Sequence, residues 1–205
     1  MKRKRYWEIG GFLAGAVLIL FGVAAVFMGV NGYNTTRDSI KAEGITFGPA
    51  SDPAVAKYAD QWAGQQVTTG DQARAFAKVM RMHTLEATGG LNYASMGRFQ
   101  SAAKPTDQAG TNDETAAAKD ATGQPIANGA RNIWVTETAL TTALNTSYMA
   151  DRLSIFSVVV GLALLLAGIG FGILALGGAL RTGEYAFAGF GKRFPKGGGA
   201  EVPTV

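Results

Sequence analysis

The sequence contains no cysteine and only one histidine, His83. Without cysteine the chain has no disulfide framework and no thiolate metal site. Zinc, haem and most non-haem iron sites need several thiolate or imidazole ligands, so a single histidine argues against each of them. We therefore expect no cofactor and no metal site, although this count does not test a site made only of carboxylates.

Sequence motifs of catalysis are missing as well. The chain has no Walker loop, no G-x-S-x-G nucleophile elbow and no H-E-x-x-H pattern. Asp113 and Glu114 are adjacent carboxylates, but in a loose loop they cannot hold an acid–base geometry. We therefore predict no catalytic residue and no enzymatic activity, unless a partner chain shares the catalytic groups.

Positive charge is concentrated at the two ends of the chain. Residues 1–8 and 181–205 together hold eight bases and three acids, whereas residues 31–152 hold eleven bases and twelve acids. This distribution indicates membrane flanks and argues against nucleic-acid binding. The bases expected to contact lipid headgroups are Arg3, Lys4, Arg5, Arg181, Lys192 and Arg193.

Two long apolar runs predict two transmembrane helices, at residues 9–30 and 153–180. The first has no polar side chain, and as a helix it would be about 33 Å long, which matches the hydrocarbon core of a bilayer. The second is wholly apolar from Val158 onward, and neither run has an ionisable residue in its core, which argues against a transporter. A cleaved signal peptide is the alternative for the first run, but that run is long and no A-x-A-like site follows it, so we expect an uncleaved anchor.

The basic flanks also predict the orientation, because Lys and Arg next to a span stay in the cytoplasm. Both termini are then cytoplasmic, and residues 31–152 face the outside of a bacterial cytoplasmic membrane. The expected fold is an all-α membrane protein, a two-helix transmembrane hairpin with a small helical extracytoplasmic domain inserted between the spans. The expected segments are a basic N-terminus at 1–8, spans at 9–30 and 153–180, the domain at 31–152, and a basic, aromatic tail at 181–205.

Glycines recur at seven-residue intervals in both apolar runs, and each run contains a G-x-x-x-G motif. Such spacing keeps small residues on one face of a helix, where they allow two backbones to approach closely. Either the two stripes face each other within one hairpin, or at least one of them meets a different protein. The predicted packing residues are Gly11, Gly15, Gly22, Gly29, Gly161, Gly168 and Gly172.

The middle region predicts four helices and one long exposed loop. The clearest helix covers residues 71–88, with Thr69 and Gln72 as a capping box and Gly89 as the stop signal. Residues 104–128 are rich in small and polar residues and form the exposed loop. A second predicted helix, 34–42, extends the first span, and a third begins at Ser51 or Asp52 with Pro53 in its first turn. The last predicted helix begins near residue 130 and continues into the second span. It carries on one side Ile133, Leu140, Leu144 and Tyr148.

Several side chains of the middle region are candidate contacts for a partner or a ligand. His83 is a structural hydrogen-bonding group between helices, a pH-sensitive contact or a single ligand. Two tryptophans are either core residues or anchors for a partner. The stripe of Arg74, Lys78 and Arg81 is either an ordinary solvated face or a site for anionic headgroups or an acidic partner. The candidate contacts are Trp62, Phe76, Met80, His83, Trp134 and Leu140.

Three motifs carry a resemblance to a known family: V-T-T-G-D-Q-A-R-A-F-A at 67–77, the helix around His83, and E-T-A-L-T-T-A-L-N at 137–145. Together with their surroundings they cover about half of the chain. They resemble small two-span actinobacterial membrane proteins that often carry the label aromatic ring-opening dioxygenase. That label is an artefact, because the family implies no iron site. The chain departs from the family in lacking an arginine soon after Glu137 and in its longer 104–128 loop. The resemblance implies an actinobacterial cell envelope and no known activity.

Two functions are compatible with these features. The first is a non-catalytic accessory, scaffolding or assembly subunit of a larger bacterial membrane complex, such as a respiratory or oxidase complex. Its partners would be other integral membrane subunits and the lipid bilayer, with a homo-oligomer as a further option. The alternative is a membrane-tethered extracytoplasmic sensor or a module that binds a lipid or small molecule. A pocket lined by Phe76, Met80, Trp134 and Leu140 would favour the alternative, and a flat apolar face there would favour the first.

Overall fold

The computed structural model describes the backbone of residues 2–177 and the side chains of residues 9–177. Residues 178–180 of the predicted second span and the predicted tail at 181–205 lie outside this range. The predicted headgroup contacts therefore also lie outside the described side chains: Arg3, Lys4, Arg5, Arg181, Lys192 and Arg193.

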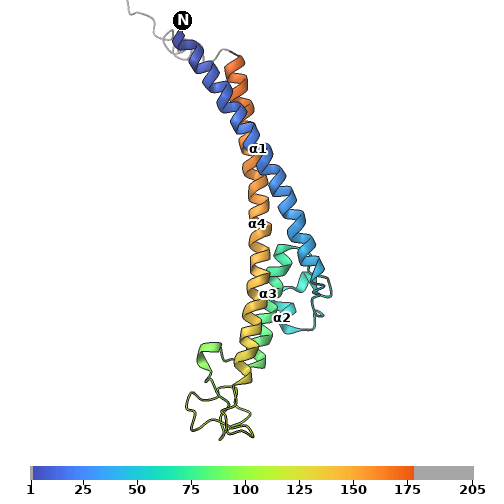
Figure 1. The fold of residues 1–205 in the computed structure, drawn as a ribbon. Helices are drawn as coiled ribbons and strands as arrows, with labels where there is room; N and C mark the ends of the chain where they lie inside the picture. Colours follow the sequence, from blue (N-terminus) through green and yellow to red (C-terminus); the bar gives the residue numbers. More distant parts are fainter. Residues whose placement is uncertain (1, 178–205) are drawn as a thin grey trace, which may run out of the picture. The chain divides into compact units, whose positions relative to one another are not determined.

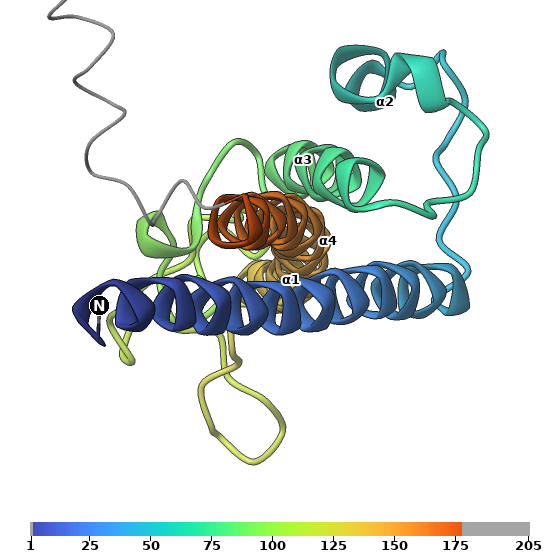
Figure 2. The same cartoon turned by 90° about the horizontal axis from the view of Figure 1, so that it is seen from above.

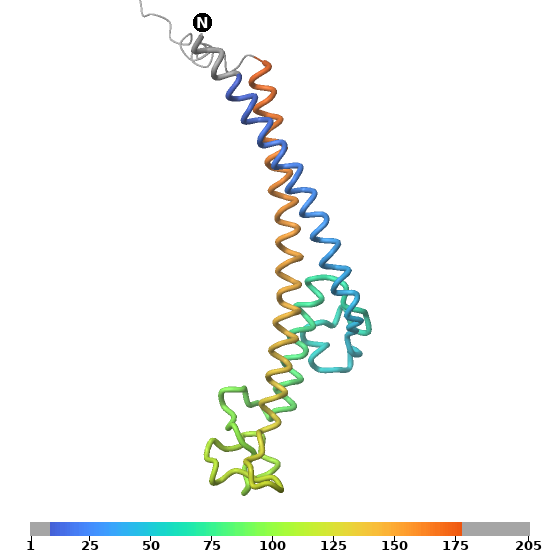
Figure 3. Tube along the Cα trace, in the orientation of Figure 1, coloured from blue at the N-terminus to red at the C-terminus, as the bar shows by residue number. Residues whose placement is uncertain are grey.

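The described residues form helices and isolated β-bridges, with no strand of a sheet (Figure 1). This confirms the all-α prediction for the described part of the chain. Figure 3 traces the last helix without a break into the apolar run, as the sequence predicted. In chain order the elements are α1 (Lys2–Ala42), α2 (Pro53–Tyr58), the 3-10 helix η1 (Asp60–Trp62), α3 (Gly70–Ala87), the 3-10 helix η2 (Tyr93–Ser95) and α4 (Gly129–Leu176).

Two of these helices are long and apolar enough to cross a membrane, as predicted. Their apolar side chains point outward along most of the two runs; Phe27 is 71% exposed and Leu166 is 72% exposed. A helix core in a water-soluble protein would bury such residues, so the exposure favours a membrane location. The side of the membrane on which residues 31–152 lie stays a prediction.

The described helices contribute to two compact units. Met1–Phe27 and Ser157–Val205 belong to the first, which we call the paired-helix unit, and Met28–Phe156 forms the central unit. Within the paired-helix unit α1 and α4 run antiparallel with their glycines face to face: a Cβ on Gly15 would lie 2.8 Å from the carbonyl oxygen of Gly168, and one on Gly161 would lie 2.8 Å from that of Gly22. These four glycines thus follow the first of the two packing alternatives, in which the stripes meet within one hairpin.

Replacing Gly168 with alanine should loosen this hairpin, because the new Cβ would lie 2.7 Å from the carbonyl oxygen of Gly15. We expect Gly168→Ala to lose about 1–3 kcal/mol of stability, as overpacking usually does, seen as a lower melting temperature of the full chain in mild detergent. Gly172→Ala is the matched control on the same helix, since its Cβ would meet nothing within 4 Å. Equal melting temperatures for the two variants would contradict the observed packing.

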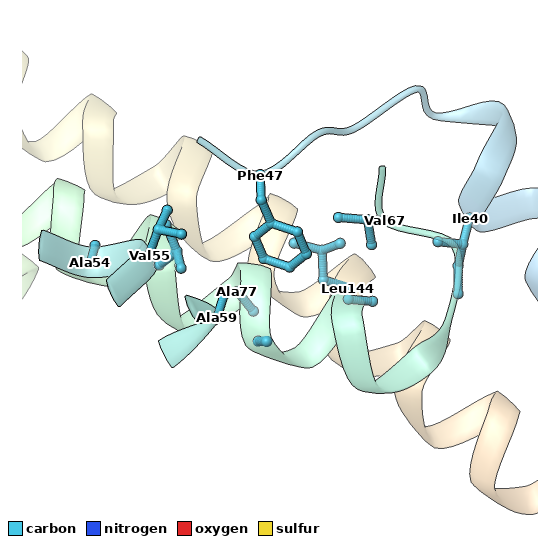
Figure 4. Packing of buried hydrophobic residues seen from close by; sticks show 11 residues of the cluster. Ile40, Phe47, Ala54, Val55, Ala59, Val67, Ala77 and Leu144 are labelled. Atoms are coloured by element: carbon cyan, nitrogen blue, oxygen red, sulfur yellow. The ribbon is translucent and has the colours of Figure 1, made fainter. Parts of the chain in front are cut away.

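The core of the central unit is small and rich in alanine. α3 lies between α4 and α2 in both views (Figures 1 and 2). Its buried residues include Ala73, Ala75 and Ala77. The ring of Phe47 lies among the other side chains of the core (Figure 4). It packs edge-on against Phe76 with centroids 5.4 Å apart and stacks on Trp62 at 6.1 Å. The buried cluster consists of Ile40, Phe47, Ala54, Val55, Ala59, Val67, Ala73, Ala75, Ala77, Val79 and Leu144.

Side-chain caps start the two middle helices where the sequence predicted. Asp52 is the N-cap of α2 and accepts a hydrogen bond from the backbone N–H of Ala54 at 2.8 Å. Thr69 caps α3 by accepting from the N–H of Gln72 at 3.2 Å. The return bond differs from an ordinary capping box, because the Gln72 side chain accepts from the N–H of Thr68, one residue before the N-cap. These bonds satisfy N–H groups that the first turn of a helix leaves unpaired.

The loop at 104–128 is exposed, and backbone hydrogen bonds tie it together. Phe99 forms antiparallel bridges to both Thr111 and Ala127. Asn128 closes the loop, since its side-chain amide donates to the carbonyl oxygens of Gly97 and Gln108 and its oxygen accepts from the N–H of Ala130. Asp113 accepts from the N–H and hydroxyl of Thr115, which is the geometry of a turn.

The buried side of α4 differs from the side that the apolar pattern predicted. Leu144 is buried, but Ile133 is 40% exposed and Leu140 is 44% exposed. The buried positions within the central unit are instead Ala130, Trp134, Glu137, Leu144, Asp151 and Ser154. Apolar periodicity could not identify this side, because two of its residues are carboxylates that face arginines of other helices.

Candidate functional site

An apolar cavity of about 560 Å³ lies within the central unit, where the end of α1, the middle of α3 and the middle of α4 converge. Phe76, Met80, His83 and Leu140, four of the predicted contact residues, all line it. The remaining lining residues are Ser39, Ile40, Glu43, Ile45, Ala143, Leu144 and Ser147. This volume falls in the range of small-molecule sites.

The floor of the cavity belongs to the buried core, and its outer wall is open. Ile40 from α1 and Leu144 from α4 are 3% and 7% exposed, so they form a fixed base. Phe76 and Met80 from α3 are partly buried and pack against the same core. Leu140, at 44% exposed, offers apolar surface that no other group of the chain covers fully. The cavity can therefore enclose an apolar group without rearranging the core.

Polar groups are confined to the rim of the cavity. The Ser39 and Ser147 hydroxyls donate to carbonyl oxygens of their own helices, Thr35 and Ala143. Their protons are therefore engaged, and their oxygens remain available as acceptors. Glu43 and His83 are the ionisable residues among the lining residues, and no lysine or arginine is among them. The rim accordingly suits a neutral or cationic polar group better than an anionic one.

His83 is hydrogen-bonded to Asp52, across from α3 to the N-cap of α2. Its Nε2 lies 2.9 Å from Oδ2 and 3.1 Å from Oδ1 of the carboxylate. The hydrogen bond from His83 is the main cause of the lowered pKa of Asp52, and the N–H groups of Ala54 and Val55 lower it further. An ionised Asp52 accepts from Nε2–H and leaves Nδ1 as the other ring nitrogen. The sequence did not indicate this pair, because 31 residues separate the two partners along the chain.

The Asp52–His83 pair predicts a loss of stability in acid. Because the pKa of Asp52 is lowered in the folded chain, the pair stabilises the fold above the ordinary pKa of about 4 and stops doing so as the pH falls through the lowered value. Asp52→Asn keeps an N-cap oxygen but removes the charge, so it should melt below the wild type at pH 7 and level with it in strong acid.

Thermal unfolding in detergent between pH 7 and pH 2 measures this difference. Asp38→Asn is the matched control, since it removes the same charge from an exposed position on α1. A gap between wild type and Asp52→Asn that stays constant over this range would contradict the assignment.

The two predicted tryptophan contacts lie outside the cavity. Trp62 is partly buried and packs on Phe47. Trp134 is 3% exposed and donates from Nε1 to the carbonyl oxygen of Leu91 at 2.9 Å. Both therefore pack in the fold as core residues, and Trp134 does not line the cavity with Phe76, Met80 and Leu140 as expected.

Two buried carboxylates of α4 were missed by sequence reasoning. Glu137 and Asp151 are each 3% exposed. An Arg81 nitrogen lies 4.0 Å from Glu137, and the same guanidinium stacks over Trp134 at 5.0 Å. Asp151 faces Arg37 of α1 at 3.8 Å. Each acid lies seven residues from Leu144, and this spacing was the available sign that they share its buried side. The sign is weak, because an acid ordinarily marks the solvent-facing side of a helix.

In the described part of the chain no cluster of three or more histidine, aspartate or glutamate side chains could hold a metal ion. Comparison with known proteins finds no matching family model, no similar curated protein and no similar solved structure. The resemblance to two-span actinobacterial proteins therefore rests on its motifs and stays a prediction.

Proposed function

We propose that the protein is a membrane-anchored binding module, whose central unit takes up a lipid or another small molecule with an apolar body. The observation that carries this proposal is the cavity of about 560 Å³ between α1, α3 and α4. Its apolar walls supply the binding free energy, and its polar groups stand only at the rim. A location outside the cytoplasm, as the charge of the flanks predicts, would expose the cavity to ligands of the cell envelope.

The volume and the apolar lining of the cavity support a ligand with one apolar chain or a small ring system. Burying its apolar part against Phe76, Met80 and Leu140 would cover side chains that are now open to solvent. At about 27 Å³ per methylene group of a close-packed chain, the volume accommodates a group with roughly ten to twenty carbons. Glu43 and His83 would then lie beside the polar end of the ligand.

A photoreactive single-chain amphiphile with a neutral head tests this proposal on the full chain in lipid nanodiscs. We expect cross-links on peptides that cover residues 76–83 and 140–147, in addition to those on the apolar runs. Ala143→Trp should reduce the cavity cross-links by roughly tenfold, because the exposed Ala143 lines the cavity and an indole there would fill it.

Asn145→Trp is the matched control, as it adds the same side chain at an exposed position of α4 that is not among the lining residues. Labelling confined to the apolar runs, or equal labelling of the two variants, would sink the proposal.

A second candidate function is an accessory subunit of a larger membrane complex. Apolar side chains on α4 of the central unit favour it, since Val135 is 57% exposed and Met149 is 64% exposed. Exposed apolar surface on a helix is a common feature of protein interfaces. The glycine stripes that first suggested a partner support it less, because Gly15, Gly22, Gly161 and Gly168 pack on each other.

Purification of the tagged full chain in mild detergent, followed by a native gel and mass spectrometry, separates the two functions. For a binding module we expect the protein to migrate alone or as a homo-oligomer. Stoichiometric co-migration of other membrane subunits would instead establish the accessory role, and the Met149→Gln variant should then weaken it.

A further inference from the structure

A second hollow of the central unit, on the side of α3 that carries Arg74 and Lys78, has the opposite character to the apolar cavity. It measures about 460 Å³, and its walls include the aromatic rings of Tyr58, Trp62 and Tyr148. From the sequence, the basic stripe of Arg74, Lys78 and Arg81 could be either a solvated face or a site for an anionic group. The structure sets two of its three bases beside these rings, whereas Arg81 pairs with Glu137 elsewhere.

The charge in this hollow is unbalanced. Its one acid, Asp71, forms an ion pair with Arg152 of α4. None of the four ion pairs in the described part of the chain includes Arg74 or Lys78. Two cations without a carboxylate partner therefore face the same concave surface. A phosphate group fits this surface, because it accepts charge-assisted hydrogen bonds from both guanidinium and ammonium groups.

Tyr148 organises the basic groups of the hollow. The guanidinium of Arg74 lies over its ring at 4.6 Å, and that of Arg152 lies over it at 5.2 Å. Stacking on a ring holds a guanidinium plane in place and leaves its N–H groups at the edge free to donate. The guanidinium of Arg74 is therefore already held in a position from which it can donate to an anion.

The position of this hollow along α4 points to a lipid as the source of the phosphate. Arg152 directly precedes the apolar run, where Leu153 is 61% exposed and Phe156 is 62% exposed. With a rise of about 1.5 Å per residue, Tyr148 stands about 7 Å before that run, which is close to the depth of a headgroup layer. α1 repeats the arrangement just beyond residue 30, where Arg37 lies over the ring of Tyr33 at 4.2 Å.

We propose that the hollow of Tyr58, Trp62, Arg74, Lys78 and Tyr148 is a binding site for the phosphate of a phospholipid headgroup at the membrane surface. This site is separate from the apolar cavity, so it holds or fails independently of the proposed ligand-binding function. Arg74 and Lys78 contact the phosphate, Tyr148 positions Arg74, and the aromatic rings cover the glycerol and the first carbons of the acyl chains.

Native mass spectrometry of the full chain, released from phosphatidylglycerol nanodiscs, tests the site through the lipid that the protein retains. The double variant Arg74→Gln, Lys78→Gln should retain about thirtyfold less lipid, since each of the two basic groups near a lipid surface contributes about 1 kcal/mol. Lys104→Gln with Lys119→Gln is the matched control, because it removes the same two charges from the 97–128 region. Arg74→Lys with Lys78→Arg keeps both charges and should restore most of the retention.

Three outcomes would overturn the proposal. One is equal lipid retention by the wild type, the double variant and the control. Another is a loss of retention in the control as large as in the double variant, which would reduce the effect to net charge. The third is release of the lipid by millimolar inorganic phosphate with direct, Arg74-dependent binding of that ion, which would make the site one for a soluble phosphate. A circular dichroism spectrum equal to that of the wild type shows that the double variant is folded.

Discussion

The close approach of α1 and α4 is the constraint on which the structure depends. The size of the side chains along one buried stripe of α4 limits how closely the two helices can approach. In the paired-helix unit this stripe consists of Gly161, Gly168 and Ala175. Lipid gives two apolar helices no hydrophobic reason to associate, so contact between backbones has to supply the attraction. Only glycine allows a carbonyl oxygen to come as near as Gly15 and Gly168 place it. Larger side chains on this stripe would separate the helices.

In the central unit the same helix buries residues of a different kind at similar spacing. Glu137, Leu144 and Asp151 follow one another at seven-residue intervals. The two acids face Arg81 of α3 and Arg37 of α1. Ion pairs therefore take part in holding the helices together in this unit. A buried carboxylate is costly without a cation nearby, and each of these has one within 4.0 Å. The composition of the stripe therefore changes with the surroundings of the helix, while its spacing is kept.

Small residues and few large ones explain why the central unit has open cavities. Alanine dominates the buried face of α3, which brings the helices together but fills little volume. The large side chains, Phe47, Phe76 and Trp62, gather on one part of the core. Between α1, α3 and α4 the space beside Phe76 stays unfilled and forms the apolar cavity. Trp62 lines the basic hollow together with Arg74 and Lys78. One fold thus contains an apolar cavity and a basic hollow.

The amino-acid sequence by itself determined the features that depend on neighbouring residues: two apolar helices, the caps at Asp52 and Thr69, the glycine stripes and the continuity of α4. These follow from helical periodicity and local hydrogen bonding. Tertiary structure decided which residues meet across the chain. It paired His83 with Asp52, drew Trp134 into the core, and put two carboxylates on the buried side of α4. Such pairings depend on the rotation of each helix about its axis, which long-range packing settles and which no local pattern records.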